Sequence, residues 1–309
     1  MTLVVGTDEA GYGPNLGPLV VTATVWDVAG PPAGVEAIFA AAAAAGRVPW
    51  RDSKRIYRAG SGLVALERGA LAGLTIAAGS PPGDWPALAA LVADTTPDVR
   101  PPETAALDAL TLPRATTAAD AATLAAELAT GLAGHGVRLV AIRCRVVQPA
   151  EFNRLLDAGL NKSDILSRTT LALAAGLLPA APREPAVVWC DRHGGRRGYA
   201  ALLATHFEAV TVRTLAETPL SSAYELPASG CRIEFSVGGE SRMPVALASM
   251  AAKYLRELSM QAFNAHWSAQ IPGLRETAGY PVDAARWRRE AEAAVQRAGI
   301  PWDAVWRRA

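Results

Sequence analysis

The sequence has few of the residues that build disulfide frameworks and zinc sites. Its 309 residues include three cysteines and four histidines. Cys144, Cys190 and Cys231 are odd in number, lie far apart and form no CxxC pair. This spacing predicts free, buried thiols in a reducing compartment, and it argues against a zinc site.

Long apolar runs and a strong net charge are also missing. Half of the residues are hydrophobic, but no run reaches the roughly 18 residues that a membrane-spanning helix needs. The first residues lack the basic segment of a signal peptide. We therefore expect a cytoplasmic protein that avoids membranes, and we expect a monomer, although no pattern specifies the oligomeric state. The net charge of +1 does not bear on nucleic-acid binding, because that depends on how basic residues cluster.

The sequence does contain alternating strand-like and helix-like segments. Apolar runs bounded by turn residues predict strands, at 3–7, 19–28, 137–147, 185–191, 209–215 and 232–237. Helical periodicity is found between them, at 35–45, 63–73, 85–93, 118–133, 152–156, 161–177, 198–206, 244–263 and 282–298. We expect an α/β fold with a mixed sheet flanked by helices. A single domain would span 1–309, with a helical Ala- and Pro-rich insertion at 58–136 and a helical C-terminal segment at 265–309.

Two adjacent acids, Asp8 and Glu9, follow the first predicted strand and precede a glycine-rich turn. Neighbouring residues of a strand point to opposite faces of the sheet, so one of the two must face whatever covers it. A buried carboxylate is costly unless it is paired or binds a cation. If the pair stood alone, we would favour the simpler interpretation that Asp8 and Glu9 serve the turn at the end of the strand.

Two further acids occupy similar positions. Asp191 ends the apolar run 185–191, and Glu240 comes shortly before the long helix that begins near Pro244. Carboxylates at neighbouring strand ends would raise one another's pKa values unless divalent cations neutralised them. Oxygen ligands without His or Cys favour Mg²⁺ or Mn²⁺, and two such ions about 3.5–4 Å apart assist phosphodiester cleavage. The alternative is that these acids are unrelated caps and turn residues.

Six short motifs, in order along the chain, resemble those of the type 2 ribonuclease H family (ribonucleases HII and HIII). The opening acids and glycine turn are similar to that family's DEAGRGP…GPVV element, and a later tripeptide is similar to its DSK motif. The motifs are Asp8 to Val20, Asp52 to Lys54, Asn161 to Leu166, Val188 to Asp191, Glu240 to Lys253 and Ala278 to Pro281. They span the chain apart from the segment 58–136.

The resemblance implies a ribonuclease H fold with a two-metal site that cleaves the RNA strand of RNA/DNA hybrids or of ribonucleotide-containing duplexes. By matching position it implies four residues that are both catalytic and metal-binding, namely Asp8, Glu9, Asp191 and Glu240, holding two Mg²⁺ or Mn²⁺ ions. It also implies six substrate contacts: Gly11, Tyr12 and Gly13 against the nucleic-acid backbone and 2′-hydroxyls, Lys54 and Lys253 on phosphates, and Tyr280 against a sugar or base. Glycine suits the first group, because close backbone approach leaves no room for a Cβ atom.

The chain also departs from the family pattern. Tyr12 stands where the family has Arg, which removes a charge and a forked donor from the turn. Glu240 stands where the HII branch has Asp and the HIII branch is expected to have Glu. The N-terminal domain of HIII is not expected, because the catalytic strand begins at residue 3. Ala278 replaces a common basic residue. These departures weaken the case for strict specificity for RNA–DNA junctions.

Two rival functions remain at this stage. The chain could be a non-catalytic nucleic-acid-binding protein of the same fold, although such a protein has no need of four converging acids. It could also be a metal-dependent DNA nuclease of the same superfamily. Asp164 and Glu217 are rival fourth acids, but capping a helix would explain Asp164. His193 would assist product release or hold a metal-bound water, yet a loop histidine without such a role is favoured. Trp302 and Trp306 are expected to pack a terminal segment.

Overall fold

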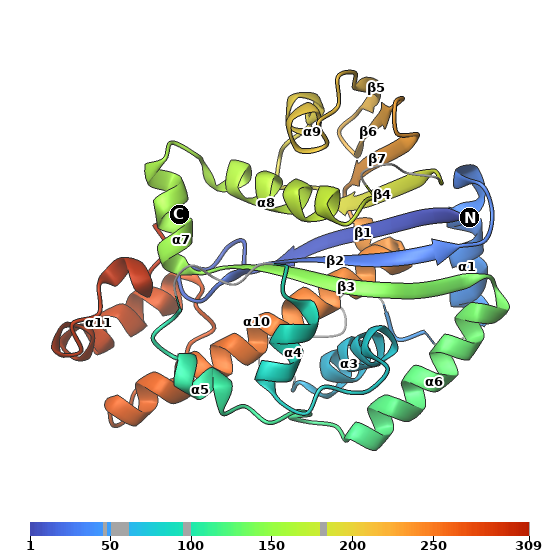
Figure 1. Cartoon of the computed structure of the whole chain (residues 1–309). Helices are drawn as coiled ribbons and strands as arrows, with labels where there is room; N and C mark the ends of the chain where they lie inside the picture. The colour runs from blue at the N-terminus through green and yellow to red at the C-terminus, as the bar shows by residue number, and fades with distance from the viewer. Residues whose placement is uncertain (46–47, 51–61, 95–99, 180–183, 309) are drawn as a thin grey trace.

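The computed structural model describes residues 1–45, 48–50, 62–94, 100–179 and 184–308. Within these residues the strands form one seven-stranded sheet in the order β3-β2-β1-β4-β7-β6-β5 (Figure 1). The strands are β1 (Thr2–Ala10), β2 (Leu19–Val28), β3 (Val137–Val147), β4 (Ala186–Asp191), β5 (Arg213–Glu217), β6 (Ser221–Leu226) and β7 (Cys231–Ser236).

The sheet is mixed. β2 pairs antiparallel with both β1 and β3, whereas β1, β4 and β7 are parallel neighbours. β6 then pairs antiparallel with β7, and β5 with β6. The predicted α/β fold with a mixed sheet is confirmed. Because β1 and β4 are adjacent and parallel, their carboxyl-terminal ends lie side by side, and these are the ends that carry the acids.

Helices cover both faces of the sheet (Figure 1). One face packs against α8 (Lys162–Gly176) and α9 (Ala200–His206), and α7 (Pro149–Asp157) precedes them. The other face packs against α1 (Val35–Ala45), α3 (Val64–Ala78), α4 (Trp85–Val92), α6 (Ala118–Gly134) and α10 (Met243–Gln270). The alternation of a strand explains the two cores: Val4 belongs to the α10 side and Val5 to the α8 side.

Helix α10 lies directly on β1 because Gly6 has no side chain. A Cβ atom at Gly6 would come within 2.5 Å of the Pro244 Cβ atom. The Thr24 hydroxyl donates to the Pro244 carbonyl at 2.8 Å, which fixes the same end of α10 to β2. The start of this helix is therefore held close to the middle of β1, two residues from Asp8.

The predicted insertion is helical in its described part, with α3, α4, α5 (Thr104–Asp108) and α6. Buried Glu67 on α3 ties it together. Its carboxylate accepts the N–H groups of residues 114, 115 and 116 and the Tyr254 hydroxyl of α10. The short helix α5 was not predicted, and α3 runs five residues past its predicted end. The assignment of the whole chain to one domain stays a prediction.

The C-terminal segment forms a third apolar cluster with the end of α10. It contains α11 (Pro281–Arg297) and the short 3-10 helix η3 (Trp302–Ala304). Trp267 and Trp287 pack edge to face at 5.5 Å, and the Arg288 guanidinium lies about 5 Å from the rings of Trp302 and Trp306. These two tryptophans thus pack the terminal segment, as predicted.

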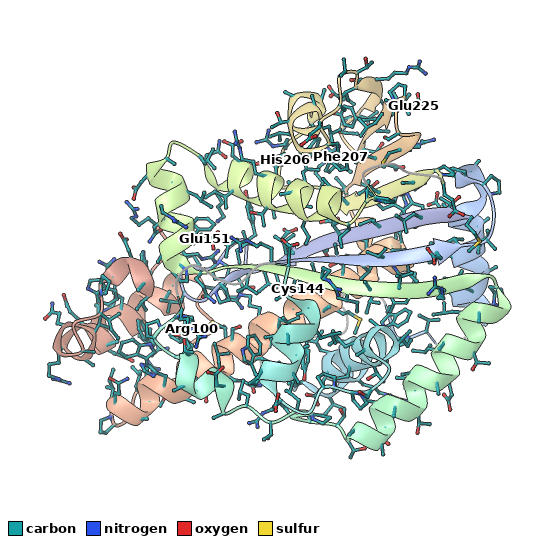
Figure 2. The ribbon with its side chains drawn as sticks, viewed as in Figure 1. Arg100, Cys144, Glu151, His206, Phe207 and Glu225 are labelled. Carbon is teal, nitrogen blue, oxygen red and sulfur yellow. The ribbon has the colours of Figure 1, made fainter. Side chains whose placement is uncertain are left out.

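The three cysteines are buried and free, as predicted. Figure 2 shows Cys144 on β3, where its sulfur lies 3.0 Å from the Thr22 hydroxyl. Within the described part of the chain, no helix combines the length and the apolar character that crossing a bilayer requires.

Candidate functional site

Asp8 and Glu9 lie inside β1, which continues to Ala10 rather than ending at Thr7 as predicted. Asp8 is 6% exposed and Glu9 is half-buried. The Glu9 N–H donates to Asp8 Oδ1 at 2.8 Å. The expectation that one acid of the pair faces a covered side of the sheet is therefore met by Asp8, on the side packed against α10.

Asp191 lies beside Asp8. It is the last residue of β4. Thr7 of β1 pairs with Cys190 on these parallel strands, so the next residues, Asp8 and Asp191, are neighbours across the two strands. Neighbouring strands are about 4.8 Å apart. The side chains of Asp8 and Asp191 therefore leave the sheet at adjacent positions.

Glu240 reaches the same place from the segment before α10. It belongs to the 3-10 helix η2 (Gly239–Ser241), whose Gly239 N–H donates to Asp191 Oδ1 at 2.8 Å. A Cβ atom on Gly239 would lie 3.1 Å from the Asp191 Cα atom. The absence of a side chain at Gly239 thus lets η2 sit on the end of β4 and brings Glu240 to Asp191.

A serine of α10 joins two of the acids. The Ser249 hydroxyl donates to Glu240 Oε1 at 2.5 Å, and its side chain also makes a hydrogen bond with Asp8. Ser249 is 2% exposed. Sequence analysis did not single it out, although it falls within the motif that begins at Glu240.

The four acids crowd one another. Burial raises the pKa of Asp8 well above its ordinary value, and the charges of Glu9, Asp191 and Glu240 raise that pKa further, in that order, while the Ser249 hydrogen bond opposes them. The prediction that these acids raise one another's pKa values is borne out at Asp8. A site that gathers this much negative charge is suited to a cation.

The donor set fits a hard divalent cation, since all four groups offer carboxylate oxygens. Among the described residues, however, no three His, Cys, Asp or Glu side chains are arranged so that they could hold a metal ion. Asp191 Oδ1 and Glu240 Oε1 are instead engaged by donors of the protein. Binding a cation would thus require these carboxylates to turn, or to bind through their other oxygens.

The glycine turn between β1 and β2 follows the acids. Gly11 and Gly17 have φ angles of +86° and +77°, in the left-handed region that favours glycine. A Cβ atom would come within 2.4 Å of the Pro18 carbonyl oxygen at Gly11 and within 2.4 Å of the Met260 sulfur at Gly17. Both glycines are therefore required by backbone conformation and by close packing.

Two tyrosines lie at this turn, Tyr12 within it and Tyr280 beside it. Tyr12 is half-buried, with the Lys162 ammonium 4.6 Å from its ring centroid. Burial, followed by the charge of Glu9, raises the Tyr12 pKa. Tyr280 is 54% exposed, and its ring lies 3.8 Å from where a Cβ atom of Gly13 would be. The structure thus brings Tyr280 to the turn from a residue 267 positions further along the chain.

Of the two lysines predicted to contact phosphates, Lys253 lies within the described residues and Lys54 does not. Lys253 lies on α10, four residues after Ser249 and three before Arg256, so these three share one face of the helix. Ser249 contacts the acids, and the Arg256 side chain packs against Gly11. Half-buried Lys253 therefore lies between the acids and the glycine turn. Lys54, with the rest of the segment 51–61, lies outside the described residues.

The rival residues do not join the cluster. His193 is 1% exposed, its Nδ1 lies 3.0 Å from the Ser167 hydroxyl, and burial lowers its pKa to about 3. Asp164 and Asn161 form a capping box at the start of α8, the capping role that was predicted. Glu217 accepts a hydrogen bond from the Tyr224 hydroxyl. None of the three is among the groups that shift the Asp8 pKa.

Sequence reasoning missed the cations that surround the glycine turn. Arg256 and Arg307 are 4% and 1% exposed, and both donate to backbone carbonyls of the turn. Arg256 follows Ser249 by seven residues, a helical spacing that could have pointed to it. Nothing in the sequence around Arg307 relates it to residues almost 300 positions earlier.

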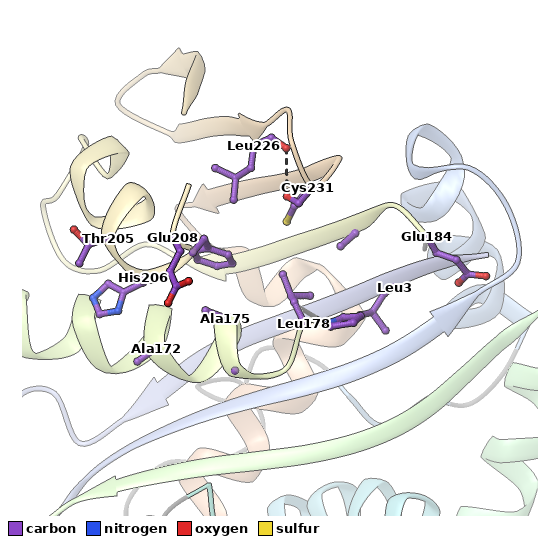
Figure 3. A pocket seen from close by; sticks show the side chains of 15 residues that line it. Leu3, Ala172, Ala175, Leu178, Glu184, Thr205, His206, Glu208, Leu226 and Cys231 are labelled. Carbon is purple, nitrogen blue, oxygen red and sulfur yellow. Dashed lines mark hydrogen bonds between the residues drawn. The ribbon is translucent and has the colours of Figure 1, made fainter. Parts of the chain in front are cut away.

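A cavity of about 850 Å³ lies elsewhere, between α8, α9 and the strands (Figure 3). Its lining includes Leu3, His206, Leu226 and Cys231, and Figure 2 places His206 and Phe207 above the sheet. Leu3 and Asp8 are five residues apart on β1, about 17 Å along a strand. The cavity and the four acids thus lie toward opposite ends of β1.

Neither a protein-family model nor a curated protein matches the chain. Several solved structures are similar to the chain. The chain is similar to ribonuclease HII from Archaeoglobus fulgidus, solved in a PCNA complex, with 16% identity, a TM-score of 0.46 and coverage of 99% of this chain and 94% of that one. It is similar to the ribonuclease H2 from Pyrococcus horikoshii at 15% identity, a TM-score of 0.44 and 98% and 92% coverage.

A third similar structure is Bst-RNase HIII in complex with Mn²⁺, at 15% identity and a TM-score of 0.45, covering 99% of this chain and 66% of that one. The chain is similar to type 2 ribonucleases H.

Proposed function

We propose that the chain is a metal-dependent endonuclease of the ribonuclease H type, which hydrolyses the RNA strand of RNA/DNA hybrids. The observation that carries the proposal is the crowding of buried Asp8 by Glu9, Asp191 and Glu240. Repulsion among four acids costs stability, and a protein that only bound nucleic acid would bind a phosphate better without them. Such crowding is expected where cations are to be held.

In this proposal Asp8, Glu9, Asp191 and Glu240 would hold two Mg²⁺ or Mn²⁺ ions. When bound, two such ions stabilise the attacking and leaving oxygens of a phosphodiester. The Ser249 hydroxyl, which hydrogen bonds to both Asp8 and Glu240, would hold these two carboxylates in a fixed relation.

The glycine turn would bind the ribonucleotide strand in the same proposal. The backbone at Gly11, Tyr12 and Gly13 would approach a sugar and its 2′-hydroxyl, the group that distinguishes RNA from DNA, and the missing side chain of exposed Gly13 leaves room for that approach. Exposed Tyr280 beside Gly13 would stack on a base or sugar, with Tyr12 on the other side of the turn. Lys253 between acids and turn, together with Lys54, would contact phosphates.

The test is a cleavage assay on three duplexes: an RNA/DNA hybrid, DNA with one embedded ribonucleotide, and plain DNA, each with Mg²⁺ and with Mn²⁺. Asp8→Asn and Asp191→Asn should each lower kcat on the hybrid more than a hundredfold, about 2.7 kcal/mol of transition-state stabilisation. Hybrid binding should persist or tighten, because a negative charge beside the phosphate is removed.

The matched control is Asp164→Asn, the same change at an acid that caps α8 outside the cluster, and it should keep near-wild-type rates. Binding of the hybrid without cleavage by the wild type would favour the non-catalytic protein. Equal cleavage of plain DNA would favour a DNA nuclease. Near-wild-type rates in Asp8→Asn would contradict the assignment of the acids.

A further inference from the structure

The last residues of the chain dock on the glycine turn. Leu16 forms an antiparallel bridge with Trp306, the Arg307 N–H donates to the Asn15 carbonyl at 2.8 Å, and the Asn15 side chain donates to the Arg307 carbonyl at 3.0 Å. Figure 1 shows the C-terminus beside α7, at the end of the sheet where β1 turns into β2. A segment remote in sequence thus closes one side of the turn.

Docking buries the Arg307 guanidinium beneath the turn. Its Nη2 donates to the Gly11 carbonyl at 2.6 Å and to the Pro14 carbonyl, and the group lies 5.0 Å from the Phe152 ring centroid. Nε and Nη1 are buried and make no hydrogen bond. In the described part of the chain no carboxylate pairs with it, and burial followed by the charge of Arg256 lowers its pKa to about 9.

These bonds fix the orientation of two peptide groups. In a trans peptide the carbonyl and the following N–H point in opposite directions. The Pro14–Asn15 peptide follows this rule: its carbonyl accepts from Arg307, and its N–H donates to the Gly279 carbonyl at 2.8 Å on the other side. In the same way, holding the Gly11 carbonyl toward Arg307 directs the Tyr12 N–H away from the core.

We propose that Arg307 is a positioning residue for nucleic-acid binding: through the docked C-terminal segment it holds the glycine turn so that the Tyr12 amide faces the backbone of the bound RNA strand. This inference rests on the proposed function. A buried guanidinium without a carboxylate is costly, and a polyanion on the far side of the turn lowers that cost. Substrate binding and docking of the C-terminal segment therefore stabilise each other.

The experiment compares Arg307→Met and Arg307→Lys in the full chain with Arg308→Met. Arg308→Met is the matched control because it removes the same charge from the same segment. The Arg308 guanidinium contacts Asn153 and Asp157 on the surface and does not contact the turn. Arg307→Met should raise KM for the RNA/DNA hybrid about 10- to 100-fold, the range for losing hydrogen bonds from a charged group, with a smaller change in kcat.

Preference for the hybrid over plain DNA should shrink in Arg307→Met. Arg307→Lys, which keeps the charge but whose ammonium ends one bond short of Nη2, should fall between Arg307→Met and the wild type. Arg308→Met should stay within about twofold of wild type, since exposed ion pairs contribute little. Unchanged KM and unchanged preference in Arg307→Met would overturn the inference, even if the variant were less stable.

Hydrogen exchange of the free protein separates this inference from the proposed function. Amides of residues 11–13, 15 and 16 should exchange faster in Arg307→Met than in wild type or Arg308→Met, without any substrate. If the wild type neither binds nor cleaves the hybrid, the proposed function fails, while the exchange rates still decide whether Arg307 holds the turn. Unchanged exchange in both Arg307 variants would show that it does not.

Discussion

Replacing His193 should remove much of the acid sensitivity of this protein. The side chain is enclosed by the rings of Tyr199 and Phe235, at centroid distances of 5.6 and 5.4 Å, and its Nδ1 meets the Ser167 hydroxyl. Burial first, and then the charge of Arg196, lower its pKa from 6.5 to about 3. The folded protein therefore keeps this imidazole neutral where the unfolded chain would protonate it.

The sign and size of the effect follow from linkage. Below pH 6.5 the unfolded state binds a proton that the folded state refuses, so stability falls as the pH drops from about 6.5 toward 3. With these two pKa values, the loss due to His193 between pH 7 and pH 5 is about 2 kcal/mol. Above pH 7 the residue contributes almost no pH dependence.

The measurement is urea unfolding of the wild type and of His193→Asn at pH 5, 6 and 7, without added metal. Asn cannot titrate but still offers Ser167 a hydrogen bond, so its packing defect lowers stability by a similar amount at each pH. The pH 7 to pH 5 loss should be about 2 kcal/mol smaller in the variant than in the wild type. Val25→Ala, a packing defect on β2 in the same apolar cluster but away from the rings that enclose His193, should retain the wild-type pH dependence.

Equal pH dependence in wild type and His193→Asn would refute the account of His193 as a buried, neutral side chain. The same variant addresses the catalytic alternative. If His193 only packs the α8 side of the sheet, His193→Asn should cleave the hybrid at close to the wild-type rate at pH 7.5. A large loss of kcat at that pH, with the protein folded, would favour a role in product release.

Three further predictions concern the turn and the insertion. Tyr12→Arg should shift cleavage toward a single embedded ribonucleotide relative to a long hybrid, because it supplies the missing forked donor; an unchanged ratio of the two rates would mean that the turn does not recognise the junction. Tyr280→Ala should slow cleavage of every ribonucleotide-containing duplex by roughly 1–3 kcal/mol and leave the Tm unchanged, since the ring is exposed; normal rates would exclude stacking. Glu67→Gln should lower the free energy of unfolding by about 1–3 kcal/mol, because the carboxylate accepts several buried donors, and urea unfolding would show no loss if those donors found other partners.

The central part of the sheet was predictable because its strands are apolar on both faces or alternate regularly. β2 and β3 match the predicted bounds, and β4 begins one residue after the predicted start at 185. The end of the sheet formed by β6 and β5 was less predictable. The predicted strand 209–215 starts at Arg213 instead, since Val210 is fully exposed and belongs to a loop. β6 was not predicted at all, because its conformation depends on pairing with β7, which local sequence does not specify.

The candidate site likewise has residues that the sequence predicted and residues that it did not. The acids, the glycine turn and Tyr280 were found because each stands in a short motif whose residue types have a physical purpose. Ser249, Arg256 and Arg307 were not found, because their importance comes from what lies beside them. Ser249 and Arg256 contact residues more than 230 positions away in sequence, and Arg307 contacts Gly11 across 296 positions.

One face of α10 explains why the acids and the turn act as a unit. Ser249, Lys253, Arg256 and Met260 follow at spacings of four, three and four residues, so they form a single stripe. The stripe contacts Asp8 at one end and Gly17 at the other. Because Gly6 lets the start of this helix lie on β1 without a spacer, a displacement of α10 would move the acids and the turn together. The distance between the four carboxylates and the glycine turn is therefore fixed by this one helix.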